Sequence, residues 1–251
     1  MGAGGSATLI DAALLAVLAA AYFWFIRSGA RGTAAPGRIA RYRRWLTYAP
    51  AAFGGSALLV LLVAGDIAAL TTLPAEFLPL VDDARRIAGL GDNVAHIEIA
   101  VLAAVLGSAL IGVALAAWRK RNGRRALTPQ AMAALVPRGR TEIGWAGLLA
   151  TIAAIVEELY FRLALPLIVA RLSGSALAAI LIATLLFARA HRGYGWPGMA
   201  FGVFSGATLA LLYLVTGQLW FAMLTHALLN LNVLVLRPLL VPVNSSVASR
   251  S

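Results

Sequence analysis

Long uninterrupted apolar stretches are the feature that most constrains the fold of this 251-residue chain. Several run to about 18 residues or more, which is the length that an α-helix needs to cross the ~30 Å hydrocarbon core of a bilayer. Hydrophobic residues make up 61% of the chain and charged residues only 12%, whereas a soluble domain carries roughly 25% charged residues. The sequence therefore predicts a polytopic integral membrane protein rather than a soluble domain.

Seven apolar segments are expected to be membrane-spanning helices. They cover residues 9–26, 48–70, 97–118, 143–170, 176–191, 196–215 and 219–240. A further segment, 128–136, begins with a threonine N-cap and a proline at the first helical position. It is too short to span, and we expect it to lie at the membrane interface. The predicted fold class is therefore all-α, a transmembrane bundle of seven helices (eight with this segment) in a single membrane domain of residues 1–251.

Basic residues predict the orientation of the bundle. The net charge is +11, and all but one of the 21 basic residues are Arg. They concentrate in loops 27–44 and 119–140, whereas residues 71–96 contain most of the acidic groups between spans. Because short cytoplasmic loops carry the excess of Lys and Arg, we expect the N-terminus outside and the C-terminus in the cytoplasm. Topology explains this charge without nucleic acid as a partner. The bias towards Ala, Leu, Arg and Gly points to a bacterial inner (cytoplasmic) membrane.

Few ionisable side chains interrupt the apolar segments. Each is a candidate for function, because a charged group at mid-helix in the membrane costs at least ~2.5 kcal/mol. The candidates are Asp66, Glu157, Glu158, Arg162, His191 and His226. Cysteine is absent, which excludes disulfides, thiolate metal sites and a cysteine nucleophile.

The first group of candidates, Glu157, Glu158 and Arg162, lies near the middle of the fourth predicted span. Adjacent helical residues point about 100° apart, so the two glutamates cannot share one task. Glu158 and Arg162 stand at i,i+4 in the favourable order and are expected to pair. Glu157 has no such partner on its own helix, which suits a general base or a ligand. The alternative is a buried network of all three charges that only holds helices together.

The remaining candidates belong to later spans. His191 follows Phe187 by four residues near the end of the fifth span, and His226 and Asn230 share one face of the seventh. Taken singly, each is explained as well by helix packing or an interhelical hydrogen bond. Together with Glu157 they can converge on one water and supply a base, a proton shuttle and oxyanion donors. Simple alternation of spans, however, places His191 near the cytoplasmic face and the other groups near the midplane.

Small residues mark the sixth predicted span. Gly198, Gly202 and Gly206 recur every four residues and form a smooth stripe. Such a stripe lets another helix approach closely. We therefore expect it to serve helix packing.

Three ordered motifs carry a family resemblance. They are Glu157-Glu158-x-x-x-Arg162, Phe187-x-x-x-His191 and His226-x-x-x-Asn230. In order and spacing they resemble the signatures of the CAAX-protease and bacteriocin-processing (CPBP or Abi) family of intramembrane endopeptidases. The resemblance covers about residues 140–235, the expected catalytic core, and the first three spans carry none of the motifs.

The resemblance also implies roles. Glu157 and His191 would activate the attacking water, and His226 and Asn230 would hold the oxyanion. The residues that would support them are Glu158 and Arg162. The family has been described both as metalloproteases and as metal-independent glutamate proteases. Glu157, His191 and His226 would also make a two-His, one-carboxylate zinc site with an open position. No tight two-His motif such as HExxH is present, so we expect no cofactor and keep zinc as the alternative.

The predicted function is that of an intramembrane endopeptidase. It would hydrolyse a peptide bond in a membrane-associated protein or peptide, with the lipid bilayer as its other partner. The alternative is a non-catalytic immunity or scaffold protein of the same family. A small transporter is disfavoured, because no inverted repeat is visible in the sequence.

Overall fold

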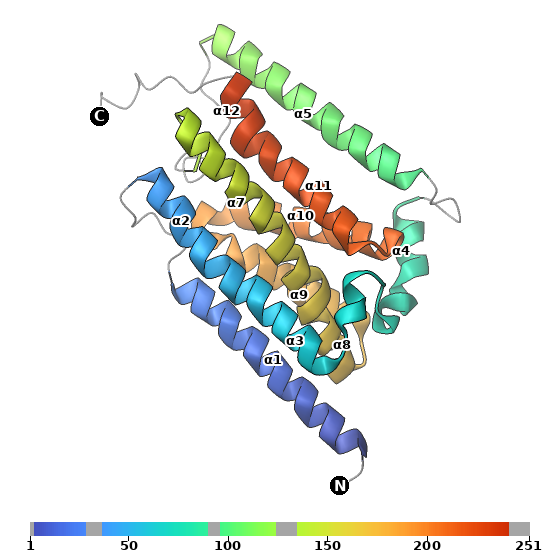
Figure 1. Ribbon diagram of the computed structural model, residues 1–251. Helices are drawn as coiled ribbons and strands as arrows, with labels where there is room; N and C mark the ends of the chain where they lie inside the picture. Colours follow the sequence, from blue (N-terminus) through green and yellow to red (C-terminus); the bar gives the residue numbers. More distant parts are fainter. Residues whose placement is uncertain (1–2, 29–36, 90–95, 124–134, 241–251) are drawn as a thin grey trace.

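The computed structural model describes residues 3–28, 37–89, 96–123 and 135–240 (Figure 1). The first helices along the chain are α1 (Ala3–Arg27), α2 (Arg38–Ala49), η1 (Pro50–Gly55), α3 (Ser56–Ala64), η2 (Ile67–Leu70), η3 (Ala75–Leu80), α4 (Val81–Ile87) and α5 (Ile97–Arg121). The later ones are α7 (Arg140–Glu158), η4 (Leu159–Ala164), α8 (Leu165–Ser173), α9 (Ala176–Ala190), η5 (Arg192–Tyr194), α10 (Gly195–Thr216), α11 (Leu219–Leu231), η6 (Asn232–Leu236) and α12 (Arg237–Leu240). No strand occurs in the described residues, so the predicted all-α class is confirmed.

Three of the long helical units are built from two α-helices with a π-helical segment between them. α2, η1 and α3 form one such unit, as do α7, η4 and α8, and α11, η6 and α12. With α1, α5, α9 and α10, the described residues hold seven long units, and α4 is a short eighth helix. This agrees with the predicted bundle. The predicted interfacial segment 128–136 lies, up to residue 134, outside the described residues.

The long units run alternately between two ends of the bundle. In Figure 1, the ends of α1 and α5, the starts of α2 and α7, and α12 lie towards the upper left. The opposite ends, namely the end of α3, the start of α5 and the turn between α10 and α11, lie towards the right or the bottom of the view. The Arg-rich segments at the start of α2 and the end of α5 therefore share one end of the bundle. This is the arrangement that a common side of the membrane requires.

Five helices are long and apolar enough to cross a membrane. They are Ser6–Arg27, Arg38–Ala64, Ile97–Arg121, Arg192–Thr216 and Leu219–Leu240. The chain is therefore an integral membrane protein, and five of its seven predicted spans meet this criterion of length and composition within the described residues. The fourth and fifth predicted spans fall outside this set. The fourth corresponds to the unit of α7, η4 and α8, and the fifth to α9, which has only 15 residues.

The second predicted span is wrong at its end, and with it the membrane position of Asp66. The helix stops at Ala64, because Gly65 adopts the left-handed conformation (φ 76°) that caps a helix C-terminus. Asp66 lies beyond the cap, where the guanidinium of Arg171 donates to both of its carboxylate oxygens, at 2.5 and 2.9 Å. The Nε of Arg171 donates to Glu76 at 2.6 Å. Asp66 therefore ties α8 to the connection after α3 and is not an intramembrane site residue.

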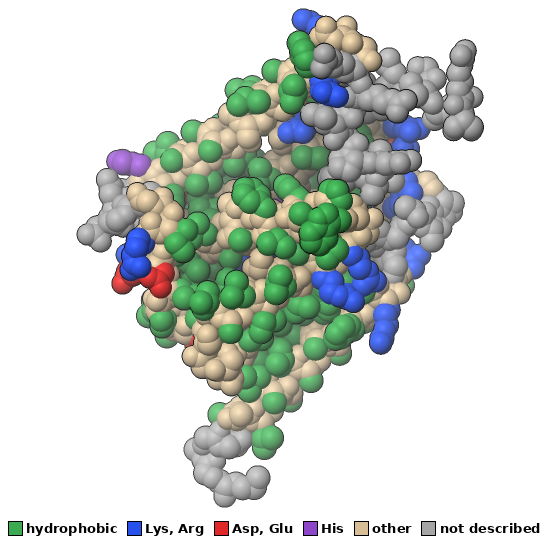
Figure 2. All heavy atoms as spheres, turned by 180° about the vertical axis from the view of Figure 1, so that it is seen from behind, with side chains coloured by type: hydrophobic (Ala, Val, Ile, Leu, Met, Phe, Trp, Pro, Cys, Tyr) green, Lys and Arg blue, Asp and Glu red, His purple; other side chains and the backbone are tan. Residues whose placement is uncertain are grey.

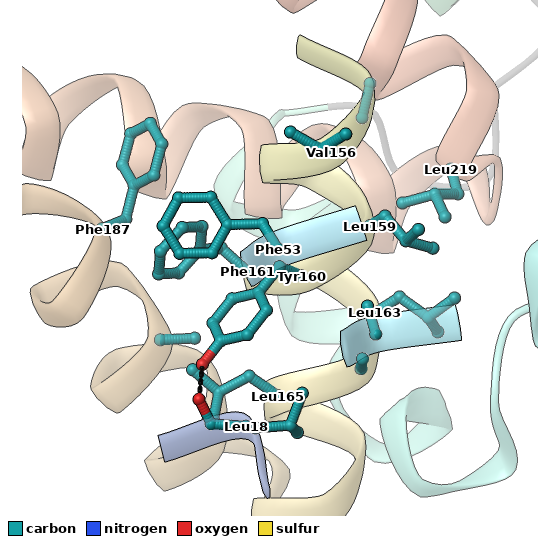
Figure 3. Packing of buried hydrophobic residues seen from close by; sticks show 14 of the residues in the cluster. Leu18, Phe53, Val156, Leu159, Tyr160, Phe161, Leu163, Leu165, Phe187 and Leu219 are labelled. Carbon is teal, nitrogen blue, oxygen red and sulfur yellow. Dashed lines mark hydrogen bonds between the residues drawn. The ribbon is translucent and has the colours of Figure 1, made fainter. Parts of the chain in front are cut away.

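An aromatic cluster at the centre of the bundle holds η4 in place (Figure 3). The rings of Tyr160 and Phe161 lie 5.0 and 5.2 Å from that of Phe53 of η1, measured between centroids. Phe161 also packs edge-on against Phe187 of α9, at 5.3 Å. The hydroxyl of Tyr160 donates to the carbonyl of Leu18 in α1, at 2.7 Å. These contacts, made with η1 and α1 on one hand and with α9 on the other, hold the backbone that carries the charged groups of α7 and η4.

Candidate active site

Two buried carboxylates end α7, and a buried arginine follows them in η4. Exposed fractions are 3% for Glu157, 0% for Glu158 and 1% for Arg162. The Nε of Arg162 lies 3.1 Å from Oε2 of Glu158, so the ion pair predicted from the i,i+4 spacing is confirmed. π-helical segments such as η4 occur frequently at functional sites. The pair places one fully buried positive charge beside the two glutamates.

Glu158 also binds a histidine from another helix. Its Oε1 atom lies 2.8 Å from Nδ1 of His226 in α11, and His226 is itself buried. One carboxylate thus links Arg162 to His226. When the Nδ1–H of His226 donates to Glu158, Nε2 is an acceptor in the neutral ring and a donor only in the protonated ring. Glu158 therefore fixes the direction in which the second nitrogen of His226 points.

Glu157 lies next to that second nitrogen. Its Oε2 atom is 4.0 Å from Nε2 of His226. The sequence predicted no partner for Glu157 on its own helix, and the neighbour that the structure supplies comes from α11. The two adjacent glutamates consequently approach the same imidazole from two sides: Glu158 through Nδ1 and Glu157 near Nε2. The different tasks expected of the two glutamates stay a prediction.

Phe187 packs against both Arg162 and the two histidines. The Cζ atom of Arg162 lies 4.5 Å from the centre of the Phe187 ring, a cation–π geometry. The ring centroids of His191 and His226 are 4.6 and 6.1 Å from that of Phe187. Both Nη atoms of Arg162 have no hydrogen-bond partner among the described residues, and its charge interacts with Glu158, with Glu157 and with this ring face.

The glycine stripe of α10 gives Phe187 its position. A Cβ atom at Gly206 would lie 3.1 Å from Cδ1 of Phe187, and one at Gly202 would lie 2.8 Å from Cα of Ala188. For these two glycines the predicted role in helix packing is confirmed. At Gly198 an added Cβ would instead meet Tyr194, in the short segment that connects α9 to α10.

His191 ends α9 and is half-buried. Its Nδ1 atom lies 2.9 Å from the carbonyl oxygen of Phe187. α8 and α9 form an antiparallel hairpin. Arg162 lies about three turns before the end of α8, and Phe187 lies about three turns after the start of α9, so the two residues meet at the same level. His191, one turn further, returns to the level of Glu158. The expected difference in depth between His191 and the two glutamates is therefore not found, because the hairpin of α8 and α9 brings them to the same level of the bundle.

Asn230 lies one turn after His226 on the same face of α11. It is half-buried, and its Nδ2 atom lies 3.4 Å from the carbonyl oxygen of Ala150 in α7. Both residues therefore face α7, as their i,i+4 spacing predicts. The long bond to Ala150 is a weak one, so the amide could turn to a stronger acceptor at little cost.

Sequence reasoning missed two of these relationships. The contact between Glu158 and His226 joins residues 68 positions apart, and no local spacing indicates it. The contact of Phe187 with Arg162 also joins two motifs. In the sequence Phe187 stood out only as the first residue of its motif. Its aromatic ring was the one feature that could have indicated a contact with Arg162.

The zinc alternative can be compared with the donor geometry. No three His, Asp or Glu side chains in the described residues lie close enough together to hold a metal ion. Glu157, His191 and His226 are thus not assembled as a ligand set in this structure. We derive no step through a metal.

Comparison with known proteins identifies the motif-bearing region. Residues 139–232 match the family model described as Type II CAAX prenyl endopeptidase Rce1-like. The match contains all six predicted site residues, and it nearly coincides with the stretch 140–235 that resembled the CAAX-protease family. No curated protein and no solved structure matches the chain significantly.

Proposed function

We propose, on the basis of the Rce1-like domain that residues 139–232 form, that this chain is an intramembrane endopeptidase. It would cleave a peptide bond of a membrane-associated protein or peptide. The observation that carries the proposal is the buried cluster in which Glu158 links Arg162 to His226 and Glu157 lies beside the same histidine. Four ionisable groups at the ends and centres of apolar helices are costly to bury unless they serve a function.

In the proposed mechanism Glu157 is the general base. It takes a proton from a water molecule as the water oxygen bonds to the scissile carbonyl carbon, and His191 orients that water. The C–N bond then breaks, and the proton passes to the leaving amine. General acid–base catalysis of this kind contributes about 100–10,000-fold. Burial strengthens it, because charge interactions are larger in a water-poor site.

His226 and Asn230 are the proposed oxyanion donors. The amide of Asn230 can donate from Nδ2, and His226 can donate from Nε2 when its ring is protonated. Glu158, at 2.8 Å from Nδ1, balances the charge of that ring. Arg162 in turn holds Glu158. The supporting pair thus positions a donor as well as stabilising the helices.

The proposal is tested by peptide termini in cells. Membrane and secreted peptides are compared among a strain without the gene, the same strain with the wild-type gene, and the strain with Glu157→Gln. We expect new N- and C-termini at one or a few cleavage sites with the wild-type gene only. An unchanged set of termini, with the protein present in the membrane, would instead favour the non-catalytic immunity or scaffold alternative.

Asn230 and metal dependence provide a second prediction. Removing one oxyanion donor typically lowers turnover ~100–1,000-fold, so Asn230→Ala should lower kcat by about that factor with little change in KM. Activity of the purified protein should survive exhaustive chelation, because protein groups supply both base and donors. Both are measured with a peptide that contains a cleavage site found in cells.

A zinc enzyme would give a different result. Zinc would be stoichiometric, it would be lost together with activity on chelation, and adding zinc would restore activity. Because a metal would itself polarise the carbonyl, Asn230→Ala would then have a smaller effect. That outcome would change the roles of Glu157, His191 and His226 from base and donors to ligands.

The proposed location is the bacterial inner membrane, with the N-terminus outside and the C-terminus in the cytoplasm. Reporter fusions at Gly37 and Gly123 should report the cytoplasm, because both positions adjoin Arg-rich helix ends. A fusion at Asp83 in α4 should report the outside. A cytoplasmic signal at Asp83 would contradict the orientation and leave the endopeptidase proposal open to its own test.

A further inference from the structure

α9 ends in exposed arginines although it is too short to cross the membrane. Its 15 residues extend about 22 Å, whereas the hydrocarbon core is ~30 Å thick. Leu181, Ile182 and Leu185 form an exposed apolar stripe along the helix. Arg189 follows Leu185 by one turn and continues that stripe, and it is also exposed. The side chain of Arg189 therefore faces the lipid and not the buried site.

The helix α1 places Arg27 at about the same level as Arg189 and Arg192. The hydroxyl of Tyr22 in α1 donates to the carbonyl of Leu186 in α9, at 3.0 Å. From this bond both helices run towards the same end of the bundle, since α9 returns antiparallel to α8. Arg27 ends α1 little more than one turn beyond Tyr22. Arg27 thus ends α1, Arg189 lies in the last turn of α9, and Arg192 begins η5 directly after it; these three residues are called the arginine cluster below.

The arginine cluster has no acidic counterpart in the part of the chain that the structure describes. All three residues are exposed, and none is within ion-pair distance of a described carboxylate. By contrast, Arg171 at the other end of the bundle is matched by two carboxylates, from Asp66 and Glu76. Exposed basic groups beside a lipid-facing surface attract anionic headgroups.

Exposed apolar side chains lie about one turn before Arg27 and Arg189 on the same helices. Phe23 and Trp24 of α1 are each 48% exposed, and Leu185 of α9 is 60% exposed. Figure 2, seen from the side of α9 and α10, shows Lys and Arg side chains gathered at one edge of a face on which hydrophobic side chains are widespread. A ligand with one anionic group and apolar chains matches this pattern, and a free anion or an acidic peptide would leave the apolar part unused.

We infer that the arginine cluster binds the phosphate headgroup of an anionic phospholipid, whose acyl chains lie along α1 and α9. His191 lies between Arg189 and Arg192 in the sequence, so the lipid would stabilise the helix end that carries it. This last consequence, unlike the binding itself, rests on the proposed function.

Lipid retention tests the inference without an assay of cleavage. The full-length protein is placed in nanodiscs of mixed phosphatidylglycerol and phosphatidylcholine, and the lipids that remain bound after release are weighed by native mass spectrometry. The wild type should retain phosphatidylglycerol in preference to phosphatidylcholine. Each basic residue near an anionic surface contributes roughly fivefold in affinity, so changing Arg27, Arg189 and Arg192 to Gln together should lower the preference by about two orders of magnitude.

A matched variant separates a site from general surface charge. Changing Arg119, Lys120 and Arg121 to Gln removes the same charge from the end of α5 at the same end of the bundle, and it should leave the preference nearly unchanged. Equal losses in both variants, or no loss in either, would overturn the inference. If the arginine cluster is needed for binding of polyglutamate but not of phospholipid, the inferred ligand would be an acidic protein and not a lipid. Equal melting temperatures would show that both variants are folded.

Discussion

Glu157→Gln is expected to abolish peptide-bond cleavage and to leave the protein folded. The amide has nearly the shape of the carboxylate but cannot take a proton from water, so the proposed base is lost. The amide also keeps the size of the side chain, so we expect the change to cost less stability than the loss of Glu158. Turnover of the purified protein and its melting temperature are the two measurements.

Glu142→Gln is the control for the loss of a carboxylate from the same helix. Glu142 lies in the first turn of α7, where it accepts a hydrogen bond from the backbone of Arg138, far from the buried cluster. Its replacement should leave turnover within about a factor of two. If Glu157→Gln kept wild-type turnover, Glu157 would not be the base, and the site would have to operate through another group.

Glu158→Gln should have the largest effect on stability. It leaves Arg162, which is 1% exposed, without its ion-pair partner, and it weakens the hold on His226. Removing one partner of a buried pair typically destabilises by about 3–5 kcal/mol, because the other charge stays buried and uncompensated. Unfolding in detergent by heat or denaturant measures the loss. Cleavage should fall as well, because His226 loses its fixed orientation.

An exposed pair provides the comparison for this loss. Asp83 lies 3.0 Å from Arg86 in α4, and both side chains are more than half exposed. Asp83→Asn should cost no more than about 1 kcal/mol, as exposed pairs generally do. Adding Arg162→Met to Glu158→Gln should recover part of the stability by removing the stranded charge. Equal stability of the Glu157→Gln and Glu158→Gln variants would contradict the division of tasks between the two glutamates.

Local patterns predicted most of the helices and one contact of the site. Apolar length and composition located the long helices, because a bilayer imposes both on any helix that crosses it. The i,i+4 spacing predicted the pair of Glu158 and Arg162, since residues one turn apart face each other on any α-helix. The facing of His226 and Asn230 followed from the same geometry. Each of these predictions depends on neighbours within about one helical turn.

What the sequence could not supply depends on how separate helices are placed. The depth of His191 follows from the hairpin of α8 and α9, and a rule of alternating full-length spans missed it. The partner of Asp66 is Arg171, more than a hundred positions away. The second partner of Glu158 is likewise remote. Such contacts are set by the packing of the whole bundle, for which one sequence offers no local signal.

The link that Glu158 makes between Arg162 and His226 also bears on how such a protein can lose its activity in evolution. Replacing Glu157 would remove the proposed base and leave the ion pair of Glu158 and Arg162 intact, whereas replacing Glu158 would break that buried pair. Drift towards a non-catalytic descendant should therefore pass through Glu157 first. A pseudoenzyme derived from this scaffold should retain Glu158, Arg162 and a residue that can bond to them at position 226, long after its catalytic carboxylate has gone.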